Sequence, residues 1–462
     1  MSHSREMGVP DMFRRLAGVS LCAVLAMAGC GGGSGSQGAA PPNPPPPTFT
    51  VSGTVTGLAA GAQLTLNDNG GDPLIVSANG GFTFATPLPL DGSYAVTIGA
   101  QPAGQTCTVS NGAGTQATAN VTTVAISCII GPAFAYVVNV LNDDVSQYAI
   151  GANGVLAPMS VPTVRSGDQP TSIAVDPSGR FAYVPNEYDS TVSQYTIGAN
   201  GGLTAMSPST VSTPATYPFG ITTDPSGRFA YVTYQGGGEI LQYSVGADGA
   251  LTAVSSPPAM AAPSVARLAI DHSGRFAYGV GPASVVAQFT IGSDGVPTAM
   301  SPPSVAAGNQ PQSIALDPSD RFVYVTNRLD NTVSQYTIGA DGALTAMSPS
   351  TVSTGIAPTF VAVDPTGRFV YVTNSSSGVS TISQYTIGVS GALTPMSTPT
   401  VTTGDGPTFV AFDPSGRFAY VVNSNVNTIS QYAIGVDGAL TALSVATVQT
   451  GTTPVSMAIF SR

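Results

Sequence analysis

The stretch DPTGRFVYVTN, residues 364–374, recurs in close copies through the second two-thirds of the chain. Its landmark, Phe-Ala/Val-Tyr, begins at seven positions that lie 46 to 49 residues apart: Phe134, Phe181, Phe229, Phe276, Phe322, Phe369 and Phe418. Each period contains four strand-like runs, and in most copies an Asn-Gly or Asp-Gly pair suited to a hairpin separates the last two. Because a period of this length with four strands is typical of a propeller blade, the chain is predicted to be all-β, with a seven-bladed β-propeller over residues 131–462.

The two ends of the repeat region indicate how the ring closes. The region begins with the second strand of the repeat, FAYVVN at 134–139, and ends with the first strand of the repeat, PVSMAIF at 454–460. Blade 1 is therefore predicted to take its innermost strand from the C-terminus, which leaves no sheet edge open at the closure.

An Asp and an Arg occupy the same positions in six turns, although only 8% of the residues are charged. The pairs are Asp176/Arg180, Asp224/Arg228, Asp271/Arg275, Asp317/Arg321, Asp364/Arg368 and Asp413/Arg417. The Asp suits the first position of a type I turn, and the Arg opens the next strand, where it can pair with the Asp or cover apolar neighbours. Since an active site is singular and these pairs are arrayed around a ring, we expect them to be scaffold.

Composition excludes several functions. All thirteen basic residues are Arg, so a Schiff-base lysine and a P-loop lysine are excluded. The net charge is −11 and no basic stripe is present, so nucleic acid is not expected as a partner. No cofactor is expected, and neither is a metal site, because His272 is the only His beyond the first 29 residues.

The N-terminus is predicted to be a targeting segment. Arg14 and Arg15 precede a short apolar run that ends at Cys30, and the sequence Met-Ala-Gly-Cys there resembles the lipobox of bacterial lipoproteins. This resemblance implies a signal peptide over residues 1–29 and a lipid anchor on Cys30. It also implies an extracytoplasmic protein held at the membrane, with Gly31 favouring the outer membrane. An ordinary secretory signal is the alternative.

Two further segments precede the repeats. Residues 30–48 are rich in Gly, Ser and Pro and are predicted to be a tether. Residues 49–130 show short strands divided by Gly-rich turns and resemble small bacterial Ig-like modules, which implies a β-sandwich that serves as a stalk. Cys107 and Cys128 form an even pair in an exported chain, so a disulfide is expected to join the last strand to an earlier one.

The repeats also carry a family resemblance. YVTN at 324–327 and 371–374, preceded by the Asp-Pro turn, resembles the YVTN-repeat branch of the lactonase-type seven-bladed propellers. That group includes 6-phosphogluconolactonase-like enzymes and surface-layer proteins, and the resemblance covers about residues 132–462. Its enzymes are associated with a His beside Arg and Glu, whereas His272 replaces the turn Pro on the predicted scaffold face.

A binding or catalytic site is expected where residues depart from the repeat. Arg267 is the most unusual residue, because the other blades have Ser172, Gly220, Ser313, Phe360, Phe409 and Ser456 at the equivalent inner-strand position. Polar residues in the loops of the face opposite the Asp-Pro turns are further candidates: Glu187, Tyr234, Glu239 and Arg328. A solvated or mutually paired loop cluster is the alternative explanation for these residues.

Three functions remain open. The leading hypothesis is a propeller that binds a protein partner or a small molecule. The second is a lactone or ester hydrolase, with Glu187 or Glu239 as base and Arg267 stabilising the oxyanion. The third is a structural surface-layer element without a ligand.

Overall fold

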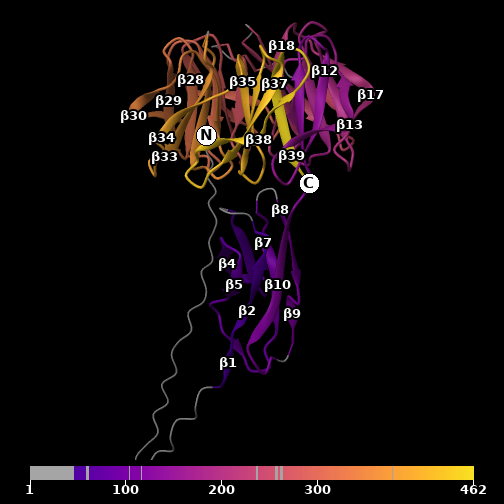
Figure 1. Ribbon diagram of the computed structural model, residues 1–462, viewed down its shortest axis with the longest axis vertical. Coiled ribbons are helices and arrows are strands. Elements are labelled where there is room, and N and C mark those ends of the chain that lie inside the picture. The colour runs from indigo at the N-terminus through magenta and orange to yellow at the C-terminus, as the bar shows by residue number, and fades with distance from the viewer. Residues whose placement is uncertain are drawn as a thin grey trace, which may run out of the picture. The chain divides into compact units, whose positions relative to one another are not determined.

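The computed structural model describes residues 46–58, 62–102, 105–115, 117–235, 238–254, 259–260, 264–376 and 378–462. Their regular elements are all β-strands (Figure 1), which confirms the predicted fold class. The predicted signal segment, Cys30 and most of the tether lie outside the described residues. In this described portion of the chain, no helix is long and apolar enough to cross a membrane.

The strands between Thr48 and Ile130 form two four-stranded sheets that share one hydrophobic core. One sheet has the order β5 (Gly80–Thr83), β2 (Val51–Thr56), β10 (Val121–Ile130) and β8 (Gln105–Ser110). The other has the order β4 (Gly71–Val76), β3 (Leu64–Asp68), β7 (Tyr94–Ala100) and β9 (Ala113–Gly114), and β1 (Thr48–Phe49) pairs with β6 (Leu88–Pro89). The predicted disulfide between Cys107 and Cys128 is present and joins β8 to β10, neighbours within one sheet.

The strands from Ala133 to Ser461 form seven sheets, which we number as blades 1 to 7. Blade 1 contains β11 (Ala133–Asn139), β12 (Asp144–Ile150), β13 (Leu156–Arg165) and β39 (Pro454–Ser461). Blade 2 contains β14 (Ala174–Val175), β15 (Phe181–Asn186), β16 (Thr191–Ile197) and β17 (Leu203–Ser212). Blade 3 contains β18 (Pro218–Thr223), β19 (Phe229–Tyr234), β20 (Glu239–Val245), β21 (Leu251–Ala253) and β22 (Ala259–Met260).

In the remaining blades, as in blades 2 and 3, the strands follow chain order from the inner strand to the outer strand. Blade 4 contains β23 (Arg267–Ile270), β24 (Phe276–Val280), β25 (Val285–Ile291) and β26 (Pro297–Ala306). Blade 5 contains β27 (Pro311–Leu316), β28 (Phe322–Asn327), β29 (Thr332–Ile338) and β30 (Leu344–Ser353). Blade 6 contains β31 (Pro358–Val363), β32 (Phe369–Asn374), β33 (Thr381–Ile387) and β34 (Leu393–Thr402), and blade 7 contains β35 (Pro407–Phe412), β36 (Phe418–Asn423), β37 (Thr428–Ile434) and β38 (Leu440–Gln449).

The C-terminal strand closes the ring as predicted. β39 pairs antiparallel with β11, so the last strand of the chain becomes the inner strand of blade 1 (Figure 1). Met457 of β39 is buried in the core that blades 1 and 7 share, which also contains Val137 and Tyr420. The closure therefore rests on backbone pairing and on apolar packing together.

A repeated joint connects each blade to the next. The hydroxyl of the landmark Tyr donates to a Gly carbonyl in the hairpin of the following blade at 2.6–2.8 Å, from Tyr136 to Gly201 through to Tyr420 and Gly154. The Gly residues have φ between 78° and 85°. A Cβ on any of them would lie within 2.5 Å of the landmark Phe ring of the preceding blade. The landmark motif therefore consists of a Phe that packs on the Gly and a Tyr that binds its carbonyl.

The six Asp/Arg pairs belong to the scaffold. Each Asp accepts a hydrogen bond from the landmark Phe N–H at 2.6–2.8 Å, as in Asp176 and Phe181. Each Arg guanidinium carbon lies 4.7–5.0 Å from the centroid of the adjacent Phe ring. The Arg therefore covers its apolar neighbour, and no ion pair joins the Asp to the Arg in these described turns.

His272 takes part in a local variation of this scaffold. In most other turns a Gly faces the Pro of the preceding blade, and a Cβ added to Gly274 would lie 3.6 Å from Pro225 Cδ. Between blades 4 and 5, His272 replaces the Pro and Asp320 replaces the Gly, and the ring Nδ1 of His272 lies 2.7 Å from an Asp320 carboxylate oxygen. The His is mostly exposed, so the structure places it in a blade-to-blade contact at the surface.

Deletion of residues 453–462 should abolish the folded propeller. The deletion leaves the edge of β11 unpaired and removes Met457 from its core, and each large buried side chain contributes about 2–5 kcal/mol against a total stability of about 5–15 kcal/mol. Circular dichroism during heating and size-exclusion chromatography would measure the loss. Removal of Arg462 alone is the control, and a cooperative transition near the wild-type temperature in the longer deletion would contradict the closure argument.

Candidate functional site

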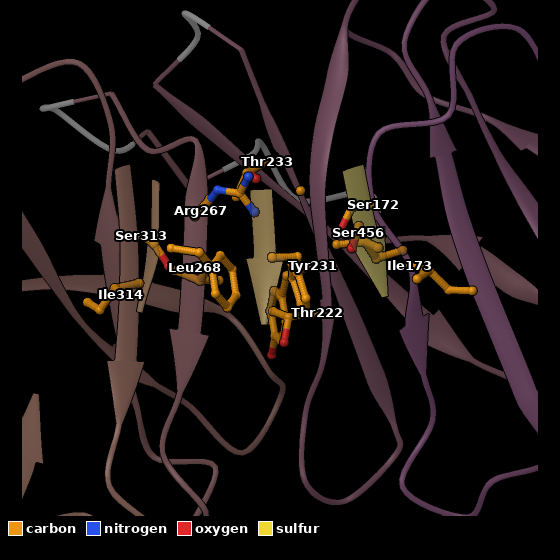
Figure 2. A pocket seen from close by; sticks show the side chains of 14 residues that line it. Ser172, Ile173, Thr222, Tyr231, Thr233, Arg267, Leu268, Ser313, Ile314 and Ser456 are labelled. Carbon is orange, nitrogen blue, oxygen red and sulfur yellow. The ribbon is translucent and has the colours of Figure 1, made fainter. Parts of the chain in front are cut away.

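One residue from the inner segment of each blade lines a single cavity of about 160 Å³, which we call the axial cavity (Figure 2). These residues are Ser172, Gly220, Arg267, Ser313, Phe360, Phe409 and Ser456. Because all seven blades contribute to one cavity, it lies at the centre of the ring. The repeat register alone therefore located the channel-facing column.

Arg267 is the charged member of this column. It is the first residue of β23, and Figure 2 shows its guanidinium at the upper end of the cavity beside Thr233. The guanidinium carbon lies 5.3 Å from the Phe219 ring centroid and 5.7 Å from that of Phe360, distances at which a cation interacts with an aromatic ring. Phe360 in turn packs against Phe409, with ring centroids 4.0 Å apart.

The Arg267 charge has no carboxylate partner among the described residues, where the ion pair of His272 with Asp320 is the only one. Neither Asp nor Glu is among the described residues that line the axial cavity. Burial lowers the pKa of Arg267 to about 10, so the guanidinium remains charged at neutral pH. An enclosed cation without a counter-charge is costly, and a bound anion would compensate it.

Arg267 also lines a second cavity of about 210 Å³, which we call the mouth pocket. The mouth pocket is formed where inner strands begin and second strands end, by residues of blades 3, 4 and 5. Three carboxamides line it, those of Gln235, Gln310 and Gln312, together with apolar groups that include Phe219. Since both cavities share Arg267, its side chain stands between them.

The other candidates lie elsewhere. Glu187 follows β15 and is half-buried, which raises the pKa of its carboxyl group, and Glu239 begins β20. Tyr234 ends β19 inside the core of blade 3, where burial raises its pKa to about 12, and Arg328 is exposed after β28. Neither cavity is lined by any of these four residues, so Arg267 is the candidate that the structure places in a cavity.

Phe219 is not among the candidate residues expected from the sequence, although the repeats contain the signal. Its equivalents in the other blades are Thr171, Ala266, Gln312, Thr359, Thr408 and Val455, so Phe219 is the aromatic exception. Val265 replaces the Pro that begins the other inner segments, and Tyr234 and Gly281 replace the Asn that ends the other second strands. These departures all fall in blades 3 and 4, the blades that enclose Arg267, and such departures are expected at functional sites.

The site has the chemistry of an anion receptor. A guanidinium presents a planar set of N–H donors that matches a carboxylate or phosphate, and the rings of Phe219 and Phe360 limit its positions. Among the residues that the structure describes, no three His, Cys, Asp or Glu side chains gather as metal ligands would.

Replacing Arg267 with Met should stabilise the folded protein by about 1 kcal/mol, because an enclosed charge without a partner is exchanged for an apolar chain of similar length. Urea unfolding would measure the change. The scaffold variant Arg275→Met is the matched control, and it should be neutral or slightly destabilising because Arg275 covers Phe276 at the surface. A loss of stability in Arg267→Met that exceeds the loss in the control would show that the charge is compensated.

Two solved structures of similar fold each cover 71% of this chain. A candidate 6-phosphogluconolactonase from Bacteroides fragilis has 20% identity and a TM-score of 0.62, with 98% of its own chain covered. PpgL, a periplasmic gluconolactonase from Pseudomonas aeruginosa, has 19% identity and a TM-score of 0.60, with 99% of its chain covered. At these identities the likeness shows the shared fold. No curated protein matches the chain significantly.

A family model, described as lactonase, 7-bladed β-propeller, matches residues 127–291, 293–394 and 375–460. The matches span most of the chain and all seven blades. They agree with the blade count and with the resemblance of the repeated YVTN motif. The chain therefore belongs to the lactonase family of seven-bladed β-propellers.

Proposed function

We propose that the propeller binds a small anionic molecule through Arg267. The observation that carries this proposal is an enclosed guanidinium that lines two cavities and has no carboxylate partner among the described residues. The protein as a whole is acidic, with a net charge of −11, so an anion is attracted by this local charge and not by the overall field. A small ligand fits better than a macromolecule, because the binding group lies inside the ring.

Hydrolysis of a lactone is the second candidate, and the comparisons favour it. The family is named for lactonase, and two of the similar structures are those of a candidate 6-phosphogluconolactonase and of a gluconolactonase. In this reaction water attacks the lactone carbonyl, the ring C–O bond breaks, and a hydroxy acid is released as its carboxylate. Arg267 would stabilise the oxyanion and then the product carboxylate.

The described cavity lining supplies this cation without a general base. Glu187 and Glu239 have the required chemistry, but neither lines the axial cavity or the mouth pocket. The geometry therefore supports anion binding directly. Hydrolysis is supported by the family relation, and by the carboxylate of its product, which Arg267 would stabilise.

Calorimetric titration of the mature chain with inorganic phosphate, gluconate and 3-phenylpropionate tests the binding proposal. We expect at least one anion to bind, Arg267→Met to abolish binding and Arg267→Lys to weaken it about tenfold or more, because Lys lacks the planar fork. Arg328→Met is the matched control and should bind normally, since Arg328 lines neither cavity. No heat of binding with any of the three anions would contradict the proposal and favour a structural element.

The same variants separate binding from hydrolysis. Acid release from a panel of γ- and δ-lactones, followed at constant pH, should depend on Arg267 if the second candidate is correct. Turnover that persists unchanged in Arg267→Met would place the reaction away from the axial cavity. Absence of turnover with every lactone, together with anion binding, would leave the propeller as a receptor.

We also propose that the mature protein is held at the outer membrane through a lipid on Cys30. The support is the apolar run followed by Met-Ala-Gly-Cys, and a Gly- and Pro-rich tether then separates the anchor from the folded modules. Labelled palmitate should enter the wild-type protein and not Cys30→Ser, and the variant should leave the membrane fraction. Equal labelling of both proteins would contradict the proposal.

A further inference from the structure

We infer that the anion bound at Arg267 carries an apolar body, aromatic or short aliphatic, that lies in the axial cavity against Phe360 and Phe409. The inference rests on the proposed anion binding and adds the chemical class of the ligand. It distinguishes an apolar monocarboxylate from a polyhydroxylated acid, which presents the same charge with a different body.

The Arg267 guanidinium and the aromatic pair of Phe360 and Phe409 line the same cavity. The Arg267 guanidinium carbon lies 5.7 Å from the Phe360 ring centroid, and the centroids of the Phe360 and Phe409 rings are 4.0 Å apart. A carboxylate that pairs with Arg267 from inside the axial cavity therefore has its next carbon atoms beside two phenyl rings. Aromatic and aliphatic groups gain free energy from such contacts.

The rest of the axial cavity is lined by apolar residues and by residues that carry hydroxyl groups. Ile173, Ile221, Leu268 and Ile314 add apolar surface, and no carboxylate or carboxamide is present among the described lining residues. Two of the polar groups already donate within the protein, Thr233 Oγ1 to Ala266 O at 2.6 Å and Tyr231 OH to Gly295 O at 2.7 Å. A body with many hydroxyls would meet there only the hydroxyls of Ser172, Thr222, Ser313 and Ser456, and each polar group left without a partner costs free energy.

The two cavities differ in the polar groups that line them. The carboxamides of Gln235, Gln310 and Gln312 line the mouth pocket and not the axial cavity. A polyhydroxylated acid would therefore have to place its body on the mouth side of Arg267. The two ligand classes thus predict contacts on opposite sides of one guanidinium, which makes them separable by mutation.

The size of the cavity limits the body. About 160 Å³ is below the usual 300–1,000 Å³ of pockets for drug-sized ligands, so the occupant is a single ring or a short chain. We therefore choose 3-phenylpropionate as the apolar probe and gluconate as the hydroxylated probe. Both carry one carboxylate, so the difference between them reports the body alone.

The test compares dissociation constants of the two probes on the mature wild-type chain by calorimetry. We expect 3-phenylpropionate to bind about tenfold or more tightly than gluconate, the difference expected from burying one phenyl group. This comparison uses only the wild-type chain, so it does not depend on whether a variant folds. Equal or tighter binding of gluconate, or binding of phosphate alone, would overturn the inference and leave the proposed anion binding intact. No binding of phosphate, gluconate or 3-phenylpropionate would overturn both.

Two variants, one in each cavity, then locate the body. Phe409→Leu should raise the dissociation constant of 3-phenylpropionate about three- to tenfold, because Phe409 lines the axial cavity. Gln312→Leu, in the mouth pocket, should leave that constant unchanged. The reverse pattern would overturn the inference. As a further control on the wild-type chain, neutral 3-phenylpropanamide should bind more weakly than the acid, because the amide lacks the charge.

Discussion

The hydrogen bond from a buried Tyr hydroxyl of one blade to a Gly carbonyl of the next is the contact on which the ring depends. It occurs between all seven pairs of neighbouring blades at 2.6–2.8 Å. Burial raises the pKa of these tyrosines, as in Tyr371, so the hydroxyl stays protonated and can donate. A blade that moved away would leave a buried donor and a buried acceptor unpaired, and this penalty fixes the distance between blades.

This joint explains why the same residues recur in every blade. Phe, Tyr and Gly are needed at every joint, and Asp and Arg at the turns support the strand that carries them. Only positions that face the channel or the loops are free to differ. A second contact between blades varies in one place. Gln288 accepts a hydrogen bond from Leu344 N–H of the next blade at 2.6 Å, whereas the equivalent Pro297 has no N–H and Gln242 donates instead to Asp294 O at 2.8 Å.

Membership of the lactonase family fixes the scaffold more firmly than the activity. Structures that share the fold at 19–20% identity differ from this chain at most positions, and activity depends on a few side chains around the channel. In this chain the channel holds Arg267, two Phe rings and hydroxyl groups, without a carboxylate among its described lining residues. Arg267 is therefore the one charged group in the described lining of the channel, and it has no carboxylate partner among the described residues.

The sequence alone determined the blade count, the ring closure and the inner column, because each depends on a period or a register that repeats along the chain. It also identified Arg267 as the exception in that column. Only the tertiary structure decided that Glu187, Glu239, Tyr234 and Arg328 line neither cavity and that Phe219 accompanies Arg267. The physical reason is that register fixes which side of a strand a residue occupies, whereas the distances between side chains of different blades depend on how those blades pack.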